Sequence, residues 1–223
     1  MSLIKEKIYE VYMMPGMAAN PLIFERIILP DNFKINYLEW LMPLDNEKLD
    51  DYIFRFSKSI VGENIVLIGV SFGGIIVQEI AKIKPVHKII IISSVKTSKE
   101  LPILMQLGKN IGAYRFFPVN WLQNFESLAQ FVFGPSIKKK IELYRKYLSV
   151  RDKKYLRWSI NKITGWNNEK YPDNLIHIHG THDLVFPSIY IKDAIFIKKA
   201  THAMILVNAK WFNDNLPDLI RKN

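Results

Sequence analysis

A serine lies between two glycines in the stretch G-V-S-F-G, residues 69–73. An aspartate and a histidine that could activate it follow more than 100 residues later in the sequence. A serine hydroxyl is a weak nucleophile until a base takes its proton, and a carboxylate must orient that base and stabilise its charged form. Asp183 follows the stretch LIHIHG, and His202 follows AIFIKKA. Together the three side chains predict acyl transfer through a serine nucleophile.

The glycines beside Ser71 fit a sharp turn between a strand and a helix. The apolar run NIVLIGV predicts the strand, and GGIIVQEIAKI predicts a helix directly after it. A serine on such a turn takes a strained backbone conformation, and the residues two before and two after it are crowded, which calls for Gly69 and Gly73. Gly74 would let the helix pack closely on the strand. The pattern is the nucleophile elbow G-x-S-x-G, and the alternative is a glycine-rich turn with an incidental serine.

The order Ser71, Asp183, His202 is the order in which an elbow serine is followed by its acid and its base. Asp193 and Asp214 are the alternative acids, and both are more simply solvated surface charges. The other histidines are assigned to structural or surface positions: His87 on the surface before a strand, His177 buried within one, His179 at its end as a brace for the acid turn, and His182 beside the acid, facing solvent.

Two N–H donors must stabilise the negative oxygen that forms during acyl transfer. We expect one from the backbone of Phe72, the residue after the serine, and one from Met17 in the turn MPGMAAN, where Gly16 permits a close approach. The alternative for Met17 is a plain loop hydrophobe. The substrate pocket is expected to include Met17, Phe72, Trp121, Phe125 and Trp158.

Strand and helix patterns alternate around the serine, which predicts a layered α/β fold. The expected strands are 7–14, 33–40, 64–70, 87–95, 174–180 and 193–200, and the expected helices are 20–28, 46–60, 73–83 and 208–220. The two central strands lack polar alternation, as parallel strands covered on both faces do. Residues 97–170 instead show helical patterns, at 99–116, 119–133, 136–149 and 152–164. Their aromatic side chains either form a small core or line a pocket over the sheet.

These motifs resemble those of the α/β-hydrolase superfamily, in its esterase-like branch with a helical cap. The matching pieces are PG at 15–16, GVSFGG at 69–74, HGTHDLVFP at 179–187 and ATHAMIL at 200–206. The resemblance implies a reduced three-layer sandwich with a mostly parallel sheet of about six strands. It implies a core of 1–96 and 171–223 with an all-helical cap inserted at 97–170. It also implies these roles: Ser71 as nucleophile, Asp183 as acid, His202 as base, and Met17 and Phe72 as oxyanion donors.

The chain departs from the family pattern in three places. Pro15 stands where a histidine is common, and Ala200 stands where a glycine is common two residues before the base. The stretch 183–202 is too short for the usual full helix before the last strand. None of these departures removes a catalytic group.

The resemblance implies a serine hydrolase that cleaves a carboxylic ester or thioester of a small-molecule acyl substrate through an acyl-enzyme. Hydrolysis of an amide or C–C bond by the same groups stays open. So does a non-catalytic ligand-binding protein on this fold, although a receptor has no need of all three groups. The sequence has no H-E-x-x-H metal spacing, no phosphate loop and no dinucleotide fingerprint, so neither a metal nor a cofactor is expected.

Composition favours a cytoplasmic location, because the chain has no cysteine, no signal-like apolar start and no apolar run of about 18 residues. The formal net charge is +10, and residues 96–170 account for all of it, with 15 Lys and Arg against 5 Asp and Glu. Such a segment either attracts anionic partners or consists of solvated helix faces, the simpler interpretation. With no recognised nucleic-acid motif, we expect neither a nucleic-acid partner nor stable membrane insertion.

Overall fold

The computed structural model describes residues 7–106 and 145–222. Within them, six strands form one sheet in the order β2-β1-β3-β4-β5-β6, and every neighbouring pair is parallel. The predicted α/β fold with a sheet of six strands is therefore confirmed. The strands are β1 (Tyr9–Met14), β2 (Phe33–Tyr37), β3 (Ile65–Val70), β4 (Lys88–Ile92), β5 (Leu175–Gly180) and β6 (Ile195–Ile197).

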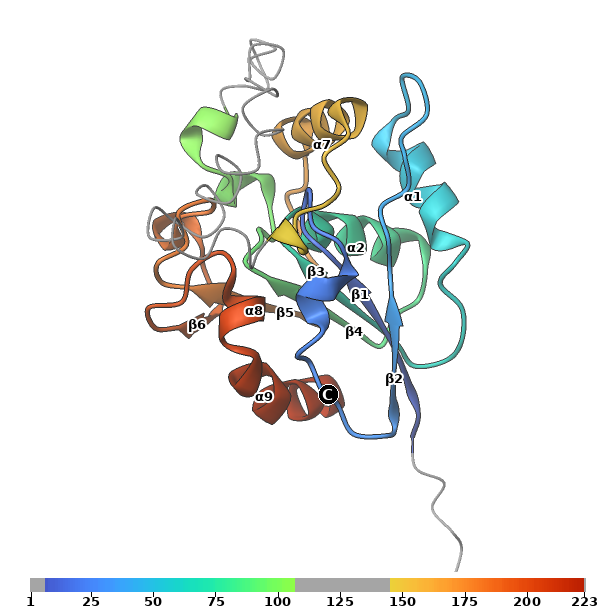
Figure 1. Ribbon diagram of the computed structural model, residues 1–223, viewed down its shortest axis with the longest axis vertical. Helices are drawn as coiled ribbons and strands as arrows, with labels where there is room; N and C mark the ends of the chain where they lie inside the picture. The colour runs from blue at the N-terminus through green and yellow to red at the C-terminus, as the bar shows by residue number, and fades with distance from the viewer. Residues whose placement is uncertain (1–6, 107–144, 223) are drawn as a thin grey trace, which may run out of the picture.

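Helices cover both faces of the sheet (Figure 1). The α-helices are α1 (Leu49–Ser57), α2 (Phe72–Ile83), α7 (Lys153–Gly165), α8 (Met204–Val207) and α9 (Ala209–Arg221). The described residues also contain the 3₁₀ turns η1 (Pro21–Phe24), η2 (Ser98–Glu100) and η5 (Ser188–Tyr190). Helices α1 and α2 pack on one face, and η1, α8 and α9 pack on the other. Helix α7 lies beyond the carboxyl ends of the strands.

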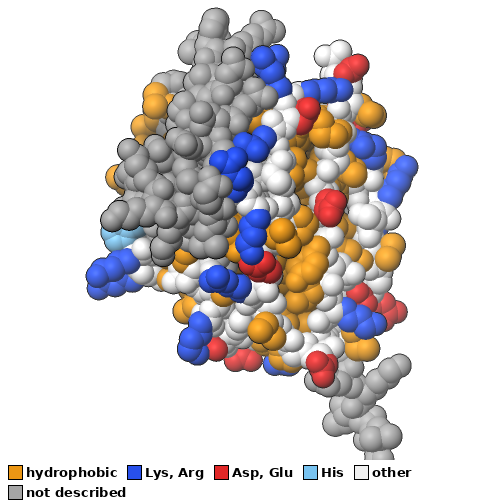
Figure 2. All heavy atoms as spheres, in the orientation of Figure 1, with side chains coloured by type: hydrophobic (Ala, Val, Ile, Leu, Met, Phe, Trp, Pro, Cys, Tyr) orange, Lys and Arg blue, Asp and Glu red, His pale blue; other side chains and the backbone are white. Residues whose placement is uncertain are grey.

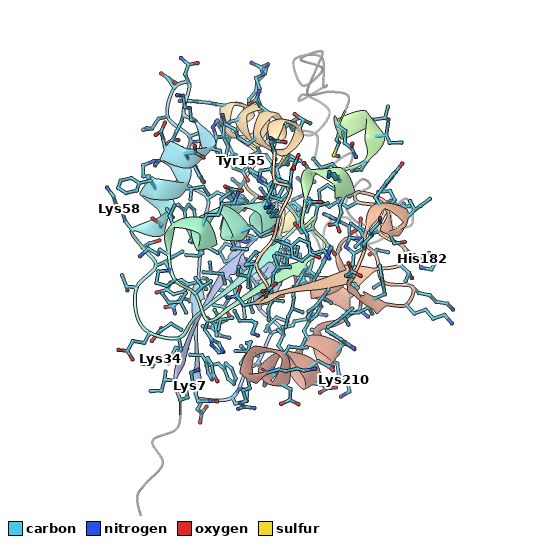
Figure 3. The ribbon with its side chains drawn as sticks, turned by 180° about the vertical axis from the view of Figure 1, so that it is seen from behind. Lys7, Lys34, Lys58, Tyr155, His182 and Lys210 are labelled. Carbon is cyan, nitrogen blue, oxygen red and sulfur yellow. The ribbon has the colours of Figure 1, made fainter. Side chains whose placement is uncertain are left out.

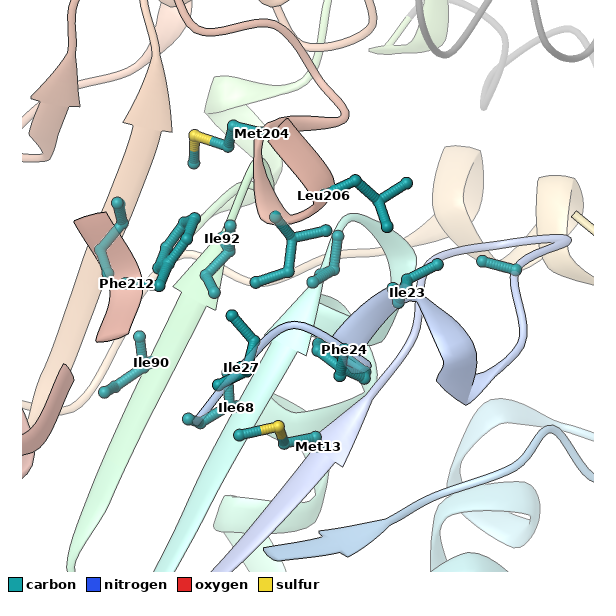
Figure 4. Close-up of a cluster of buried hydrophobic side chains, with 14 of the residues drawn as sticks. Met13, Ile23, Phe24, Ile27, Ile68, Ile90, Ile92, Met204, Leu206 and Phe212 are labelled. Carbon is teal, nitrogen blue, oxygen red and sulfur yellow. The ribbon is translucent and has the colours of Figure 1, made fainter. Parts of the chain in front are cut away.

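Alternate residues of β1, β3 and β4 belong to two separate hydrophobic cores. In β1, Val11 and Met13 join the core under η1, α8 and α9, while Tyr12 and Met14 join the core under α1 and α2. Strands β3 and β4 are buried along their whole length, which explains their lack of polar alternation. Figure 4 shows the first core, where side chains from strands, turn and helices meet: Met13, Ile23, Phe24, Ile27, Ile68, Ile90, Ile92, Met204, Leu206 and Phe212.

Several elements are shorter than predicted, and three of them have a clear local cause. The helix expected at 20–28 is the single 3₁₀ turn η1, although Asn20 does cap it by accepting from Leu22 N at 2.9 Å. The helix expected at 46–60 begins only at Leu49, after Asn46 turns the chain with a φ of 57°. The strand expected at 193–200 is reduced to β6, because Asp193 (φ 46°) and Lys199 (φ 61°) leave the extended conformation on either side of it.

One predicted helix of the segment 97–170 falls within the described residues. The pattern at 152–164 forms α7, whose N-terminus is capped by Asp152 accepting from Tyr155 N at 3.0 Å. The helix predicted at 119–133, with Trp121 and Phe125, lies outside the described residues, as does most of 99–116 and 136–149. In the part of the chain that the structure describes, no helix has the length and apolar character needed to cross a membrane.

Two basic residues of 97–170 pair with acidic residues that precede α1. Lys146 contacts Glu25 at 2.8 Å, and Lys154 contacts Asp45 at 2.6 Å. Basic and acidic side chains are interspersed over the face seen in Figure 2. The described basic residues of 97–170 thus include Lys146 and Lys154, which form ion pairs with loops before α1, as well as solvated side chains.

Candidate active site

Ser71 occupies the turn between β3 and α2 with a strained backbone, φ 53° and ψ −122°. A side chain is rarely tolerated at such a positive φ. A Cβ on Gly69 would overlap the backbone of Gly73, and a Cβ on Gly73 would overlap the carbonyl oxygens of Met14 and Pro15. Both glycines are therefore required by close approach, one inside the elbow and one against the end of β1.

The elbow is fixed from the neighbouring strand. Ser71 N–H donates to the Ile92 carbonyl at 2.9 Å, and the Ser94 hydroxyl donates to the Ser71 carbonyl at 2.7 Å. Gly74 leaves room for this, because a Cβ there would overlap Ser94 Oγ. The close packing expected at Gly74 is thus made against the residues that follow β4.

The three predicted side chains meet at the carboxyl edge of the sheet. His202 Nε2 lies 2.9 Å from Ser71 Oγ, and His202 Nδ1 lies 2.8 and 3.0 Å from the carboxylate oxygens of Asp183. An ionised carboxylate only accepts hydrogen bonds, so Nδ1 carries the proton and Nε2 is left to accept the serine hydroxyl. Asp183 and His202 are buried, and Ser71 is half-buried. The arrangement can pass a proton from Ser71 to His202.

Backbone donors hold the Asp183 carboxylate in place. Its Oδ1 accepts from Val185 N at 2.8 Å and from Phe186 N at 2.9 Å. His179 supports the same turn, because its Nε2 donates to the Phe186 carbonyl at 2.8 Å. The remaining ring nitrogen of His179 therefore accepts from His177 Nε2, at 3.2 Å. This agrees with the predicted brace role of His179.

Burial lowers the pKa of His179 and lowers that of His177 well below its ordinary value. Both rings are therefore neutral at pH 7, and neither competes with His202 as a cation beside Asp183. Among the described residues, no group of three or more acidic or histidine side chains is arranged to hold a metal ion.

The turn that carries Asp183 is bonded to the turn that carries His202. Thr181 N donates to the Ile197 carbonyl at 3.1 Å, and His182 N donates to the Ala200 carbonyl at 2.9 Å. In the opposite direction, Lys199 N donates to Thr181 Oγ1 at 2.8 Å. The short passage between acid and base thus forms one bonded unit, even without a full crossover helix.

The residues set aside as alternatives lie away from Ser71. His182 is exposed, at the rim of the molecule in Figure 3. Asp193 is exposed before β6, and Asp214 forms an exposed pair with Lys210 on α9. His87 differs from the expected surface residue: it is half-buried, with its ring Nε2 3.0 Å from the Ile220 carbonyl.

Two N–H groups beside Ser71 have no acceptor in the described part of the chain. Gly16 lies against the serine, since a Cβ built on it would be 3.2 Å from Ser71 Cβ. The next residue, Met17, has an N–H with no recorded partner among the described residues, and Phe72 N–H opens α2, where the helix supplies none. Two neighbouring N–H groups that have no acceptor among the described residues could both donate to a negatively charged oxygen.

Aromatic side chains gather near these donors. Phe72 stacks on Trp40 with ring centroids 5.1 Å apart. The ring centroid of Trp158 lies 6.1 Å from that of Phe72 and 4.4 Å from that of Tyr52. Three of the predicted pocket residues, Met17, Phe72 and Trp158, thus lie in one region, while Trp121 and Phe125 fall outside the described residues. Sequence reasoning missed Trp40, Tyr52 and Tyr155. Trp40 had a usable signal: it closes a predicted parallel strand, at the sheet edge where Ser71 was expected.

No protein-family model and no curated protein matches the sequence. Solved structures do match. A non-heme bromoperoxidase BpoC from Mycobacterium tuberculosis is 11% identical, with a TM-score of 0.69 over 95% of this chain and 91% of its own. An enol-lactonase from Burkholderia xenovorans is 13% identical, with a TM-score of 0.68 over 97% and 93%. A lipase-esterase related protein from Clostridium acetobutylicum is 18% identical, with a TM-score of 0.65 over 96% and 95%. The TM-scores establish the fold, while sequence identities this low leave the activity open.

Proposed function

We propose that this protein, which has the α/β-hydrolase fold, is a serine hydrolase that cleaves a carboxylic ester or thioester. The supporting observation is the position of His202, whose two ring nitrogens contact Ser71 Oγ at 2.9 Å and the Asp183 carboxylate at 2.8 Å. In this proposal Ser71 is the nucleophile, His202 the base and Asp183 the acid. The N–H groups of Met17 and Phe72 form the oxyanion hole.

Acylation follows from these contacts. Ser71 Oγ attacks the carbonyl carbon while its proton passes to His202 Nε2, and Asp183 stabilises the resulting imidazolium. The carbonyl oxygen becomes negative and is stabilised by the two N–H donors. His202 then gives the proton to the leaving alcohol or thiol as the C–O or C–S bond breaks. The acyl group remains esterified to Ser71.

Deacylation reuses the same groups. Water loses a proton to His202 Nε2 and attacks the acyl carbon, with the oxyanion again held by Met17 and Phe72. The bond to Ser71 Oγ breaks, the serine recovers its proton from His202, and the carboxylic acid product leaves. The bidentate contact with Asp183 keeps the imidazole in the tautomer that both half-reactions need.

The aromatic side chains near Ser71 favour an apolar acyl or alkyl group in the substrate. Trp40, Phe72 and Trp158 lie on the carboxyl edge of the sheet, and α7 brings Trp158 there from the segment 97–170. We propose this segment as the helical cap that completes the pocket over the core of 1–96 and 171–223. Structural neighbours named as an esterase from Rhodococcus and an enol-lactonase are consistent with an acyl substrate.

A fluorophosphonate probe tests the nucleophile. We expect labelling of the wild type and no labelling of Ser71→Ala. Ser59→Ala, which changes an exposed serine at the end of α1, is the matched control and should label like the wild type. Equal labelling of the wild type and Ser71→Ala would exclude Ser71 as the nucleophile.

The bond that is cleaved needs a second experiment. A chain-length series of p-nitrophenyl esters, run beside acyl thioesters and anilides, should show Ser71-dependent turnover of an ester or thioester. Turnover of anilides alone would instead favour the amide alternative. Tight binding of acyl compounds without turnover would favour a ligand-binding protein.

A further inference from the structure

Trp40 contacts both segments that carry the N–H groups of Met17 and Phe72, which have no acceptor within residues 7–106 and 145–222. Its indole Nε1 donates to the Gly16 carbonyl at 3.0 Å. Its ring stacks on Phe72, with centroids 5.1 Å apart and an interplanar angle of 11°. One side chain from the loop after β2 therefore links the turn after β1 to the first residue of α2.

The hydrogen bond from Trp40 fixes the direction of the Met17 N–H. The Gly16 carbonyl and the Met17 N–H belong to one trans peptide plane, so the two groups point in opposite directions. The carbonyl is held by the indole and by Ala19 N, which donates to it at 3.1 Å. The Met17 N–H consequently points away from the indole and cannot turn without breaking both bonds.

Tyr155 also contacts the ring of Trp40. Tyr155 is a fully buried residue of α7 (Figure 3), and the centroid of its ring lies 5.3 Å from that of Trp40. Its hydroxyl accepts from Ala18 N at 3.4 Å, where the backbone turns with a φ of 67°. Burial raises the pKa of Tyr155 well above its ordinary value, so the hydroxyl stays neutral. The indole thus contacts the rings of both Phe72 and Tyr155.

We infer that Trp40 is a positioning residue for both donors of the oxyanion hole. Its N–H sets the peptide that presents Met17, and its ring sets the side chain of Phe72. This inference rests on the proposed function, and it assigns Trp40 no contact with the reacting atoms. A group that acts on the donors alone should affect the tetrahedral, negatively charged state more than the bound substrate.

Trp40→Phe removes the indole N–H and keeps an aromatic ring on Phe72. We expect kcat to fall between about tenfold and hundredfold with KM within about twofold, since a misplaced donor costs less than a deleted one. Affinity for a boronic acid, which forms a tetrahedral anion on the serine, should fall by a similar factor. Affinity for a carboxylate product should not change.

Replacing Trp40 with benzothienylalanine tests the N–H alone. This residue has the shape of tryptophan and lacks only the donor, so folding and stacking are retained while the bond to Gly16 is lost. It should reproduce the kcat effect of Trp40→Phe. Trp166→Phe is the matched control, because it also removes a buried indole donor. The hydrogen bond of Trp166 goes to Glu79 at 2.7 Å and does not involve the Gly16 turn. It should lower stability and leave kcat and boronic acid affinity intact.

The outcomes separate this inference from the function beneath it. Full kcat and full boronic acid affinity in both Trp40 variants, with an active wild type, would overturn the positioning role and leave the hydrolase proposal standing. Loss of activity through a raised KM alone would also overturn it, because that result assigns Trp40 to the substrate pocket. A wild type that neither turns over acyl substrates nor binds the boronic acid would overturn both.

Discussion

The hydroxyl of Ser94 donates a 2.7 Å hydrogen bond to the backbone carbonyl of Ser71. A residue that follows β4 thereby holds the conformation of the residue that follows β3. The Ser71 N–H is held in the same way by the Ile92 carbonyl. The strained turn is thus stabilised by hydrogen bonds to the backbone of Ser71, and these bonds do not involve its hydroxyl. The conformational strain at Ser71 can therefore be measured separately from the role of the hydroxyl in catalysis.

Replacing Ser71 with glycine and with alanine separates strain from chemistry. Both variants lose the hydroxyl, but only glycine relieves the positive φ. We expect Ser71→Gly to be more stable than Ser71→Ala by about 1 kcal/mol, and neither to turn over substrate. Urea unfolding measures the difference. Equal stability of the two variants would show that the turn is not strained.

Asp183→Asn should lower kcat by about 10⁴-fold with the fold intact. The asparagine amide would donate to His202 Nδ1, which moves the ring proton to Nε2 and removes the acceptor for the serine hydroxyl. Steady-state kinetics and circular dichroism provide the measurement. Asp214→Asn, which alters an exposed ion pair on α9, is the matched control and should keep wild-type kcat. A fully active Asp183→Asn would rule out the proposed acid.

Much of the sheet could be predicted because its strands are uninterrupted apolar runs. The strands expected at 64–70 and 87–95 correspond to β3 and β4 within a few residues, since burial on both faces leaves a continuous signal. The edge strand β6 was predicted too long, because two positive φ values end it and sequence patterns do not encode them reliably. The order of Ser71, Asp183 and His202 followed from the same topology.

The buried pair His177 and His179 predicts loss of stability on acidification. Burial lowers the pKa of both, so below their ordinary value of 6.5 the unfolded chain binds protons that the folded chain excludes. Their contribution is complete above about pH 6.5 and declines as the pH falls, by at most about 1.4 kcal/mol per unit for each ring.

Urea unfolding on either side of this pH measures the slope. His177→Gln keeps a donor toward His179 and removes one titrating ring. The slope of the free energy of unfolding against pH should therefore decrease by up to the equivalent of one bound proton. An unchanged slope would show that His177 titrates alike in both states.

Asn20→Ala should loosen the attachment of the segment that precedes α7. The Asn20 amide donates to the Lys146 carbonyl at 2.6 Å and to Ser149 Oγ at 2.7 Å, and its oxygen caps η1. We expect a loss of about 1–2 kcal/mol and faster tryptic cleavage after Lys146. Asn213→Ala, which breaks two comparable bonds to Arg26 and Ile28, is the control. It should lose stability without faster cleavage at that site; equal cleavage in both would contradict the attachment.

The contacts around the proposed oxyanion donors, Met17 and Phe72, could not be predicted in the same way. The contact between Trp40 and Gly16 joins residues 24 positions apart, and that between Ala18 and Tyr155 joins residues 137 apart. Local periodicity places each residue on an element but carries no information about which elements will touch. The glycines of the elbow were predictable because the steric demand there is local to one turn.

Hydrogen bonds join the Asp183 turn to the His202 turn, so the site consists of two separately bonded parts. One part contains the carboxylate and the imidazole, tied through Thr181 and Lys199, and the other contains Ser71 on its elbow. The hydrogen bond from Ser71 Oγ to His202 Nε2 joins their side chains, and the pairing of β4 with β5 joins their backbones. Because the sheet holds the two backbones together, a fluctuation that breaks this hydrogen bond should separate only the hydroxyl from the imidazole. The imidazole then stays bound to Asp183, and it returns to the hydroxyl in the tautomer that accepts the serine proton.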